Sequence, residues 1–221
     1  MSKAPDRVPP EFIVVEGPIG VGKTSLVNRL AESLGCPSLL ERAEENPFLE
    51  RFYEDAPAAA FPAQLHFLFQ RSRQLAHLRQ RDLFATGLVA DFMFEKDRLF
   101  AELNLEREEL ALYDEVYARL SMDAPTPDLV VYLQAPVEVL MGRVRKRGRL
   151  QERTLSSEYL ARLSEAYARF FYRFDAAPVL IVNAAEINPL DSEADYRALL
   201  EQIRRPQRGK RYFNPAPLAI N

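Results

Sequence analysis

The sequence of 221 residues has one cysteine, two histidines and no long run of apolar residues. Cys36 alone can form neither an internal disulfide nor a cysteine-cluster metal site. Two histidines, His66 and His77, argue against a histidine-based zinc site. No apolar run is long enough to span a membrane, and the polar, proline-rich start shows no hydrophobic segment of a secretory signal. We therefore expect a cytoplasmic protein without a membrane partner, with a flexible tail at residues 1–10.

The charge balance is also close to neutral. Twenty-nine basic residues face 32 acidic ones, for a net charge of −3, and no basic block suggests nucleic acid as a partner. A hydrophobic content of 48% over this length suits one domain with a substantial core. We expect that domain at residues 11–205, followed by a C-terminal tail at 206–221.

Short β-rich runs alternate with longer helical patterns, which predicts an α/β fold of three layers: a parallel sheet of five strands with helices on both faces. Predicted strands cover residues 11–16, 38–41, 87–91, 128–134 and 178–183. Predicted helices cover residues 23–34, 47–54, 61–83, 93–101, 106–121, 136–146, 156–174 and 192–204.

Residues 17–25 read GPIGVGKTS and match the phosphate-binding loop G-x-x-x-x-G-K-[ST]. The loop lies between an apolar strand and a helix, where backbone N–H groups can surround a polyphosphate. Lys23 can reach the β- and γ-phosphates, and the Thr24 hydroxyl can bind Mg²⁺. The pattern predicts a nucleoside triphosphate site in a P-loop NTPase fold. Its expected nucleotide contacts are Gly17, Gly20, Gly22, Lys23, Thr24 and Ser25.

Two carboxylates follow predicted strands. Glu41 ends the second strand and Asp91 the third. Ligands of open parallel sheets bind outside the carboxyl ends of the strands, so both side chains should face the phosphate loop. There a carboxylate can accept a proton from an attacking hydroxyl or hold Mg²⁺. The alternative is that each caps the next helix.

Two further groups have a functional and a plain interpretation. On the predicted helix 61–83, Gln64 and Arg71 are seven residues apart and share one face, suited to a planar polar ligand or merely to solvent. The basic run at residues 143–149 is either solvated or a lid that closes on a transferring phosphoryl group. Its candidate lid residues are Arg143, Arg147 and Arg149.

In order and spacing, these motifs resemble those of the deoxynucleoside kinase family, which phosphorylates deoxycytidine, deoxyguanosine and deoxyadenosine. The resemblance covers most of residues 12–172. The residues that carry it are 17–25, Glu41, Asn46 to Leu49 with Phe52 and Tyr53, Gln64 to Arg71, Asp91 to Arg98, and Arg143 to Glu152. The phosphate loop alone is shared with many unrelated enzymes, whereas Tyr53, Gln64 and Arg71 followed by the arginine-rich lid and Glu152 are far more specific.

The resemblance implies ATP and Mg²⁺ as cofactors and a role for each site residue. Glu41 resembles the carboxylate that activates the 5′-hydroxyl, and Asp91 the acidic residue that orients Mg²⁺ or accepts the proton. The implied acceptor-site residues are Tyr53 and Glu152 for the 3′-hydroxyl, and Gln64, Arg71 and Asp97 for the base. The resemblance also implies a homodimer.

The sequence departs from the family at two places. Glu41 is followed by Arg42-Ala43 where the family commonly has Pro-Val. Asp91 is followed by Phe92-Met93 where the family often has Arg-Ser, so the arginine that helps position the catalytic carboxylate is missing. Arg42 or a lid arginine is a candidate to replace it.

The charged pair Arg71 and Asp97 fits a thymine methyl poorly, which favours deoxyadenosine or deoxyguanosine as the acceptor, with deoxycytidine as an alternative. Other phosphate-loop functions stay open from the sequence. One is a nucleoside monophosphate kinase, and another is a non-catalytic nucleotide-binding protein.

Overall fold

The computed structural model describes residues 10–54, 56–80, 87–121, 124–149, 152–206 and 208–214. The strands are β1 (Phe12–Glu16), β2 (Ser38–Leu39), β3 (Leu88–Ala90), β4 (Leu129–Gln134), β5 (Val179–Asn183) and β6 (Lys210–Phe213). The α-helices are α1 (Lys23–Leu34), α2 (Leu49–Glu54), α3 (Ala56–Gln80), α4 (Lys96–Asn104), α5 (Arg107–Ser121), α6 (Val137–Arg147), α7 (Ser157–Arg173) and α8 (Glu193–Arg204), with a 3₁₀ turn η1 (Ala43–Glu45). None of the helices in the described part of the chain is long and apolar enough to cross a membrane.

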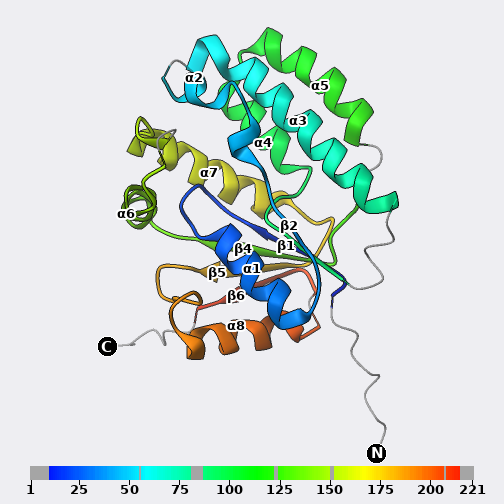
Figure 1. Ribbon diagram of the computed structural model, residues 1–221, viewed down its shortest axis with the longest axis vertical. Helices are drawn as coiled ribbons and strands as arrows, with labels where there is room; N and C mark the ends of the chain where they lie inside the picture. The colour runs from blue at the N-terminus through cyan, green and yellow to red at the C-terminus, as the bar shows by residue number, and fades with distance from the viewer. Residues whose placement is uncertain are drawn as a thin grey trace, which may run out of the picture.

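The strands form one parallel sheet in the order β2-β3-β1-β4-β5-β6 (Figure 1). The predicted α/β fold with a parallel sheet is confirmed, but the count of five strands is wrong. The sixth strand, β6, falls within the segment predicted to be a tail and pairs with β5 from Lys210 to Phe213. Its sequence Lys-Arg-Tyr-Phe begins with two basic residues and is half exposed, as suits an edge strand. It therefore lacks the apolar run that marks a central strand.

Several predicted boundaries also differ from the structure. Strand β2 ends at Leu39 and not at residue 41, and helix α2 begins at Leu49 and not at residue 47. Helix α3 begins at Ala56, so Pro62 lies inside it rather than at its start. The predicted end of this helix at residues 81–83 lies outside the described residues. Helix α4 begins at Lys96 rather than at residue 93, because Phe92 and Met93 leave β3 in a non-helical segment that is buried in the core.

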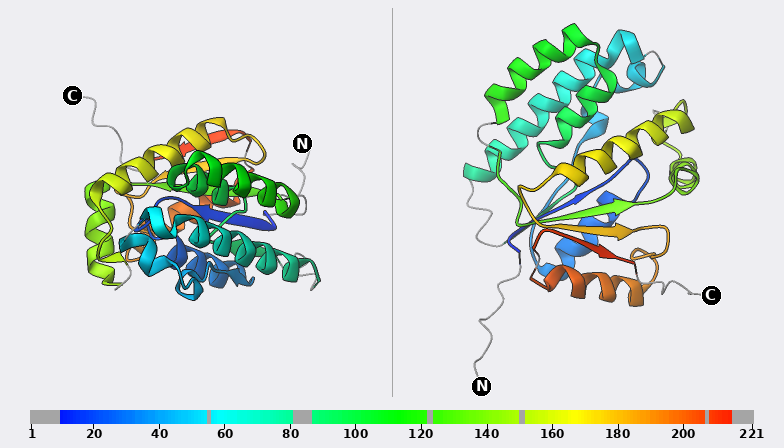
Figure 2. Two further views of the ribbon diagram at one scale, coloured as in Figure 1. Left: turned by 90° about the horizontal axis from the view of Figure 1, so that it is seen from above. Right: turned by 180° about the vertical axis from the view of Figure 1, so that it is seen from behind.

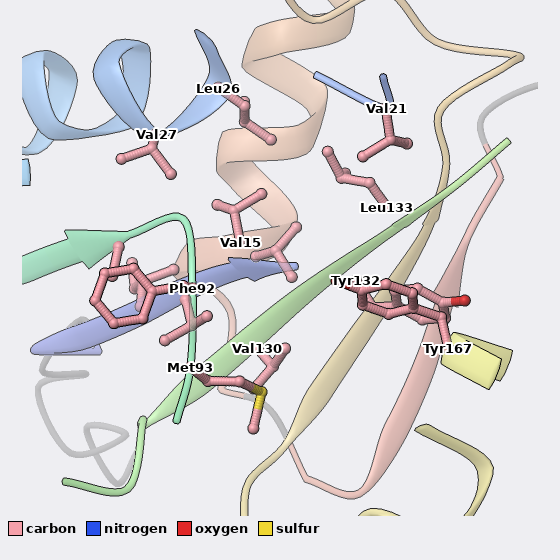
Figure 3. Close-up of a cluster of buried hydrophobic side chains, with 14 of the residues drawn as sticks. Val15, Val21, Leu26, Val27, Phe92, Met93, Val130, Tyr132, Leu133 and Tyr167 are labelled. Atoms are coloured by element: carbon pink, nitrogen blue, oxygen red, sulfur yellow. The ribbon is translucent and has the colours of Figure 1, made fainter. Parts of the chain in front are cut away.

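Alternate side chains of the central strands face opposite layers. In Figure 3, Val15 of β1 points toward Leu26 and Val27 of α1, while Tyr132 of β4 lies with Tyr167 of α7 on the other side of the strands. The rings of Tyr132 and Tyr167 stack with centroids 6.0 Å apart. The sheet is thus covered on both faces, as its almost wholly apolar strands require.

The helices α2 to α5 gather beyond α7, away from α8 (Figures 1 and 2). Helix α3 contacts α2, α4 and α5, and α4 contacts α7. After β1 the chain forms β2 at the edge of the sheet and then returns to form β3 between β2 and β1. It then crosses to β4, on the other side of β1. Such a reversal of strand order leaves a crevice at the carboxyl ends of the strands. The phosphate loop follows β1 into that crevice.

Candidate active site

A cleft of about 650 Å³ opens at the carboxyl ends of β1, β2 and β3. This volume suits a small-molecule ligand. Most of the predicted site residues line it, although they come from segments far apart in the sequence. They are Gly20, Lys23, Thr24, Glu41, Tyr53, Gln64, Arg71, Asp91, Arg147, Arg149 and Glu152.

The phosphate loop has a backbone that only glycine permits at two points. Gly17 has φ +146°, and a Cβ there would collide with the carbonyl oxygen of Leu133. Gly20 has φ +85°, and its Cβ would lie 2.8 Å from the carbonyl oxygen of Leu140. The loop therefore packs directly on the backbone of β4 and α6. In this conformation the backbone N–H groups of the loop can surround a phosphate.

Lys23 begins α1 and turns back over the loop. Its Nζ donates to the carbonyl oxygens of Gly17, at 2.8 Å, and Pro18, at 3.3 Å. Burial and the nearby charge of Lys96 lower the pKa of Lys23 to about 8, although Glu16, Glu41 and Asp91 act in the opposite direction. A bound anion would favour the charged ammonium.

Asp91 links three segments that line the cleft. Its Oδ2 accepts a hydrogen bond of 2.6 Å from the Thr24 hydroxyl, and its Oδ1 accepts one of 2.6 Å from the backbone N–H of Glu41. The end of β3 is thereby joined to α1 and to the end of β2. A threonine hydroxyl beside a carboxylate is a pair of hard oxygen donors of the kind that Mg²⁺ prefers.

Glu41 lies between two cations. Its Oε1 accepts from Arg71, with 3.0 Å to Nε and a second, shorter contact to Nη2, and its Oε2 accepts from Lys96 Nζ at 3.2 Å. Burial disfavours the charged form, but Arg71 and Lys96 outweigh it and hold the pKa of Glu41 well below its usual range. The carboxylate is therefore ionised and able to accept a proton or a hydrogen bond.

Arg71 joins Glu41 to a second carboxylate deeper in the molecule. Its Nη1 lies 2.5 Å from Asp97 Oδ1, and the two side chains are 3% and 0% exposed. Burial raises the pKa of Asp97 to about 6 despite the charge of Arg71. Asp97 does not line the cleft and stands behind Arg71. On the cleft wall beside them, Gln64 is 2% exposed, and its Oε1 has no hydrogen-bond partner among the described residues. That oxygen is left for a ligand.

Tyr53 and Glu152 face the cleft from α2 and from the end of the lid segment. Burial raises the pKa of the Tyr53 phenol, and the negative charge of Glu152 adds to the effect. Glu152 accepts from Arg147 Nη2 through both oxygens, at 2.6 and 2.5 Å. The two polar groups that the resemblance assigned to one hydroxyl thus lie in the same cleft.

The three predicted lid arginines separate in the structure. Arg147 and Arg149 line the cleft, whereas Arg143 does not. Arg143 donates to the backbone carbonyl of Val21 at 3.2 Å and to that of Ala184 at 2.7 Å. It therefore braces the phosphate loop against the segment after β5.

Sequence reasoning missed two charged residues of the site, Glu16 and Lys96. Glu16 ends β1 and is fully buried, and it accepts from the backbone N–H groups of Gly17 and Met93 and from the Tyr167 hydroxyl. A charged residue that closes an apolar strand directly before the phosphate loop was the available signal. Lys96 carried none, because a lysine at the start of a helix is ordinarily solvated.

The phosphate loop and an ionised carboxylate line one cleft, which lies where the strand order reverses. This arrangement defines the class of the protein: a P-loop phosphotransferase that acts on a small molecule. The sequence model of the family described as "Deoxynucleoside kinase" matches residues 13–206. The chain belongs to the deoxynucleoside kinase family. It is a phosphotransferase with a hydroxyl acceptor, and it phosphorylates deoxynucleosides.

Individual relatives agree with this assignment. The chain is 35% identical over 157 residues to a deoxyguanosine kinase of Bacillus subtilis, covering 71% of this chain and 76% of the relative. It is 29% identical over 202 residues to a deoxyadenosine/deoxycytidine kinase of the same organism, covering 87% and 91%. Among solved structures, a deoxyadenosine kinase from M. mycoides with bound dCTP superposes with a TM-score of 0.73 at 25% identity, covering 87% of this chain and 98% of the other.

Proposed function

We propose that the chain transfers the γ-phosphoryl group of ATP, bound with Mg²⁺, to the 5′-hydroxyl of a purine deoxynucleoside, either deoxyadenosine or deoxyguanosine. The observation that carries this proposal is the ionised Glu41 in the same cleft as the phosphate-loop lysine and threonine. Glu41 accepts the proton of the attacking hydroxyl, since it lines the cleft, whereas both oxygens of Asp91 are taken by the Thr24 hydroxyl and the backbone N–H of Glu41.

The donor half of the proposal rests on the phosphate loop. Lys23 binds the β- and γ-phosphates, and Gly17, Gly20, Gly22 and Ser25 supply backbone or side-chain donors around them. Thr24 and Asp91 would hold Mg²⁺, which neutralises charge on the phosphates when it is bound. The lid arginines Arg147 and Arg149 stabilise the transferring group, while Arg143 acts through the loop that it braces.

The acceptor half rests on the opposite wall. Tyr53 and Glu152 hold the 3′-hydroxyl, and Gln64 pairs with the edge of the base through its unpartnered oxygen and its amide group. Arg71 completes the base contacts, and Asp97, which is buried behind it, holds the guanidinium in place. The guanidinium supplies donors and the Gln64 amide supplies both a donor and an acceptor, as a purine edge requires. Relatives named deoxyguanosine kinase and deoxyadenosine kinase support the purine preference.

The test is a phosphoryl-transfer assay of the purified chain with ATP and Mg²⁺ against deoxyadenosine, deoxyguanosine, deoxycytidine and thymidine. We expect the highest kcat/KM with a purine deoxynucleoside and the lowest with thymidine. The four deoxynucleoside monophosphates serve as control acceptors. Folded, ATP-binding protein with no turnover on any deoxynucleoside would refute the proposal. Activity on a monophosphate alone would indicate a nucleoside monophosphate kinase.

The proposal includes a cytoplasmic location, where ATP and free deoxynucleosides are both present, and a homodimer. Two large apolar side chains support an interface on the outer helices: Phe69 of α3 is 43% exposed and Leu112 of α5 is 52% exposed. Sedimentation of the wild type and of a Leu112→Glu variant tests this. The wild type should sediment at twice the mass of the chain, and the variant should shift toward the monomer.

A further inference from the structure

Lys96 is an unusual lysine. Its side chain is 4% exposed, although lysine is almost never fully buried unless it is paired. It starts α4 and reaches into the cleft, where its Nζ donates to Glu41 Oε2 at 3.2 Å and lies 5.7 Å from the centroid of the Phe100 ring. Burying a cation costs free energy. Glu41 offsets this cost only partly, because it is also paired with Arg71.

Two features of Lys96 indicate that an anionic ligand completes its environment. An ammonium has three protons to donate, and among the described residues Glu41 is its one hydrogen-bonded partner. Its charge is also close enough to that of Lys23 to lower the pKa of Lys23. The nearby carboxylates offset part of this repulsion, and a multiply charged anion between the two lysines would stabilise both charges.

Phe92 supplies no positive charge to Glu41. Where the resembled family often has an arginine, this chain has Phe92, which is 0% exposed and packs in the core beside Val15 (Figure 3). Arg42, the candidate from the sequence, is paired with Glu45 and its side chain is 62% exposed. Lys96 instead comes from one turn farther along the chain and reaches the same carboxylate.

We propose that Lys96 is a catalytic residue of the phosphoryl transfer: it holds Glu41 in place and contacts the transferring phosphoryl group. This rests on the proposed function. In the step, the 5′-oxygen forms a bond to the γ-phosphorus, and its proton passes to Glu41. The bond from that phosphorus to the β–γ bridging oxygen breaks, and its electron pair leaves on ADP. Lys96 keeps its protons and stabilises the negative charge on the phosphoryl oxygens.

The test compares Lys96→Met and Lys96→Arg with wild type in steady-state kinetics and thermal unfolding. We expect Lys96→Met to lower kcat by about 10²- to 10³-fold, as removal of one transition-state donor does, with KM for both substrates changed less than about threefold. Lys96→Arg keeps the charge and should stay within about tenfold of wild type. The melting temperature of Lys96→Met should not fall, because Glu41 retains Arg71 and methionine replaces the apolar stem.

Arg98→Met is the matched control, since Arg98 lies on the same helix, pairs at the surface with Asp114 and lies outside the cleft. It should have wild-type kcat. A Lys96→Met enzyme with kcat within threefold of wild type would overturn the proposal, and so would a loss confined to KM. If Lys96→Met does not fold, Lys96→Gln is judged by the same criteria. Absence of turnover in the wild type would refute the proposed function instead.

Discussion

Two glutamates lie at the carboxyl ends of strands of the same sheet, and their surroundings are opposite. Glu41, after β2, is flanked by Arg71 and Lys96, and its side chain is 18% exposed. Glu16, at the end of β1, is 0% exposed and is held by two backbone N–H groups and the Tyr167 hydroxyl. The pKa of Glu41 is lowered by its cations, whereas burial raises that of Glu16 despite the charges of Lys96 and Lys23.

The difference separates two tasks. Glu41 carries a charge on the wall of a cleft, where a substrate hydroxyl can reach it. Glu16 cannot meet a substrate, but its bonds connect the phosphate loop at Gly17, the segment after Asp91 at Met93, and helix α7. In the proposed mechanism one carboxylate does chemistry, while the other holds the parts of the donor site together. Residue type alone would not have distinguished them.

The largest expected effect is on turnover in Glu41→Gln. Removing the proton acceptor should lower kcat by about 10³-fold, within the usual range for a general base, while ATP affinity in calorimetry stays within about threefold. Glu32→Gln, on the exposed face of α1, is the control. Wild-type turnover in Glu41→Gln would indicate that Asp91 is the base. It would also refute the proposed functional difference between Glu41 and Glu16.

Glu16→Gln should act on stability before activity. The amide would place an N–H donor against the backbone N–H of Gly17 or Met93, which costs about 1–3 kcal/mol for a buried group left without its acceptor. Urea unfolding measures this, with the exposed Glu138→Gln as control. A variant as stable as wild type but with kcat lost to the extent seen in Glu41→Gln would mean that Glu16 also takes part in the chemistry.

The two glutamates also act on the pKa of Lys23. Burial lowers that pKa to about 8, and the negative charges of Glu16 and Glu41 keep it from falling further. Below pH 8 the ammonium is charged and binds phosphate, and above it the charge is lost. ATP affinity of the wild type should therefore fall above pH 8 by up to about tenfold per pH unit. Removing either charge should move this fall to lower pH. A shift in Glu41→Gln without one in Glu16→Gln would show that Glu16 is uncharged near pH 8.

The smallest effect is expected for Tyr167→Phe. It removes the 3.0 Å hydrogen bond to Glu16 Oε2 and keeps the ring that stacks on Tyr132. We expect a loss of about 1 kcal/mol in unfolding free energy and turnover within twofold of wild type. Thermal unfolding and kcat are measured together. A fall in kcat without a fall in stability would show that α7 positions the reacting groups and not only Glu16.

Much of the donor site was predictable because it is local. The strand, the loop and the start of α1 are contiguous, so residues 12–25 specify their own geometry. The central strands were found because burial on both faces demands apolar runs. Strand β6 was missed for the converse reason: an edge strand pairs through its backbone, and its basic side chains Lys210 and Arg211 give no apolar signal.

The acceptor wall depended on assembly. The roles of Glu41, Arg71 and Asp97 came from the resemblance to a family, yet their ion-pair chain joins the segment after β2 with α3 and α4. Glu41 and Arg71 are 30 residues apart in the sequence, and Arg71 and Asp97 are 26 apart. Lys96 had no comparable signal. It reaches Glu41 because α4 begins at the cleft.

By itself, the sequence determined that this protein binds a nucleotide phosphate on a glycine-rich loop in a parallel α/β fold, because backbone conformation and strand burial are short-range properties. Only the tertiary structure decided which carboxylate lies between two cations, which is buried next to the phosphate loop, and that Lys96 contacts Glu41. Those outcomes depend on burial and on charges a few ångströms away, and distant segments supply both.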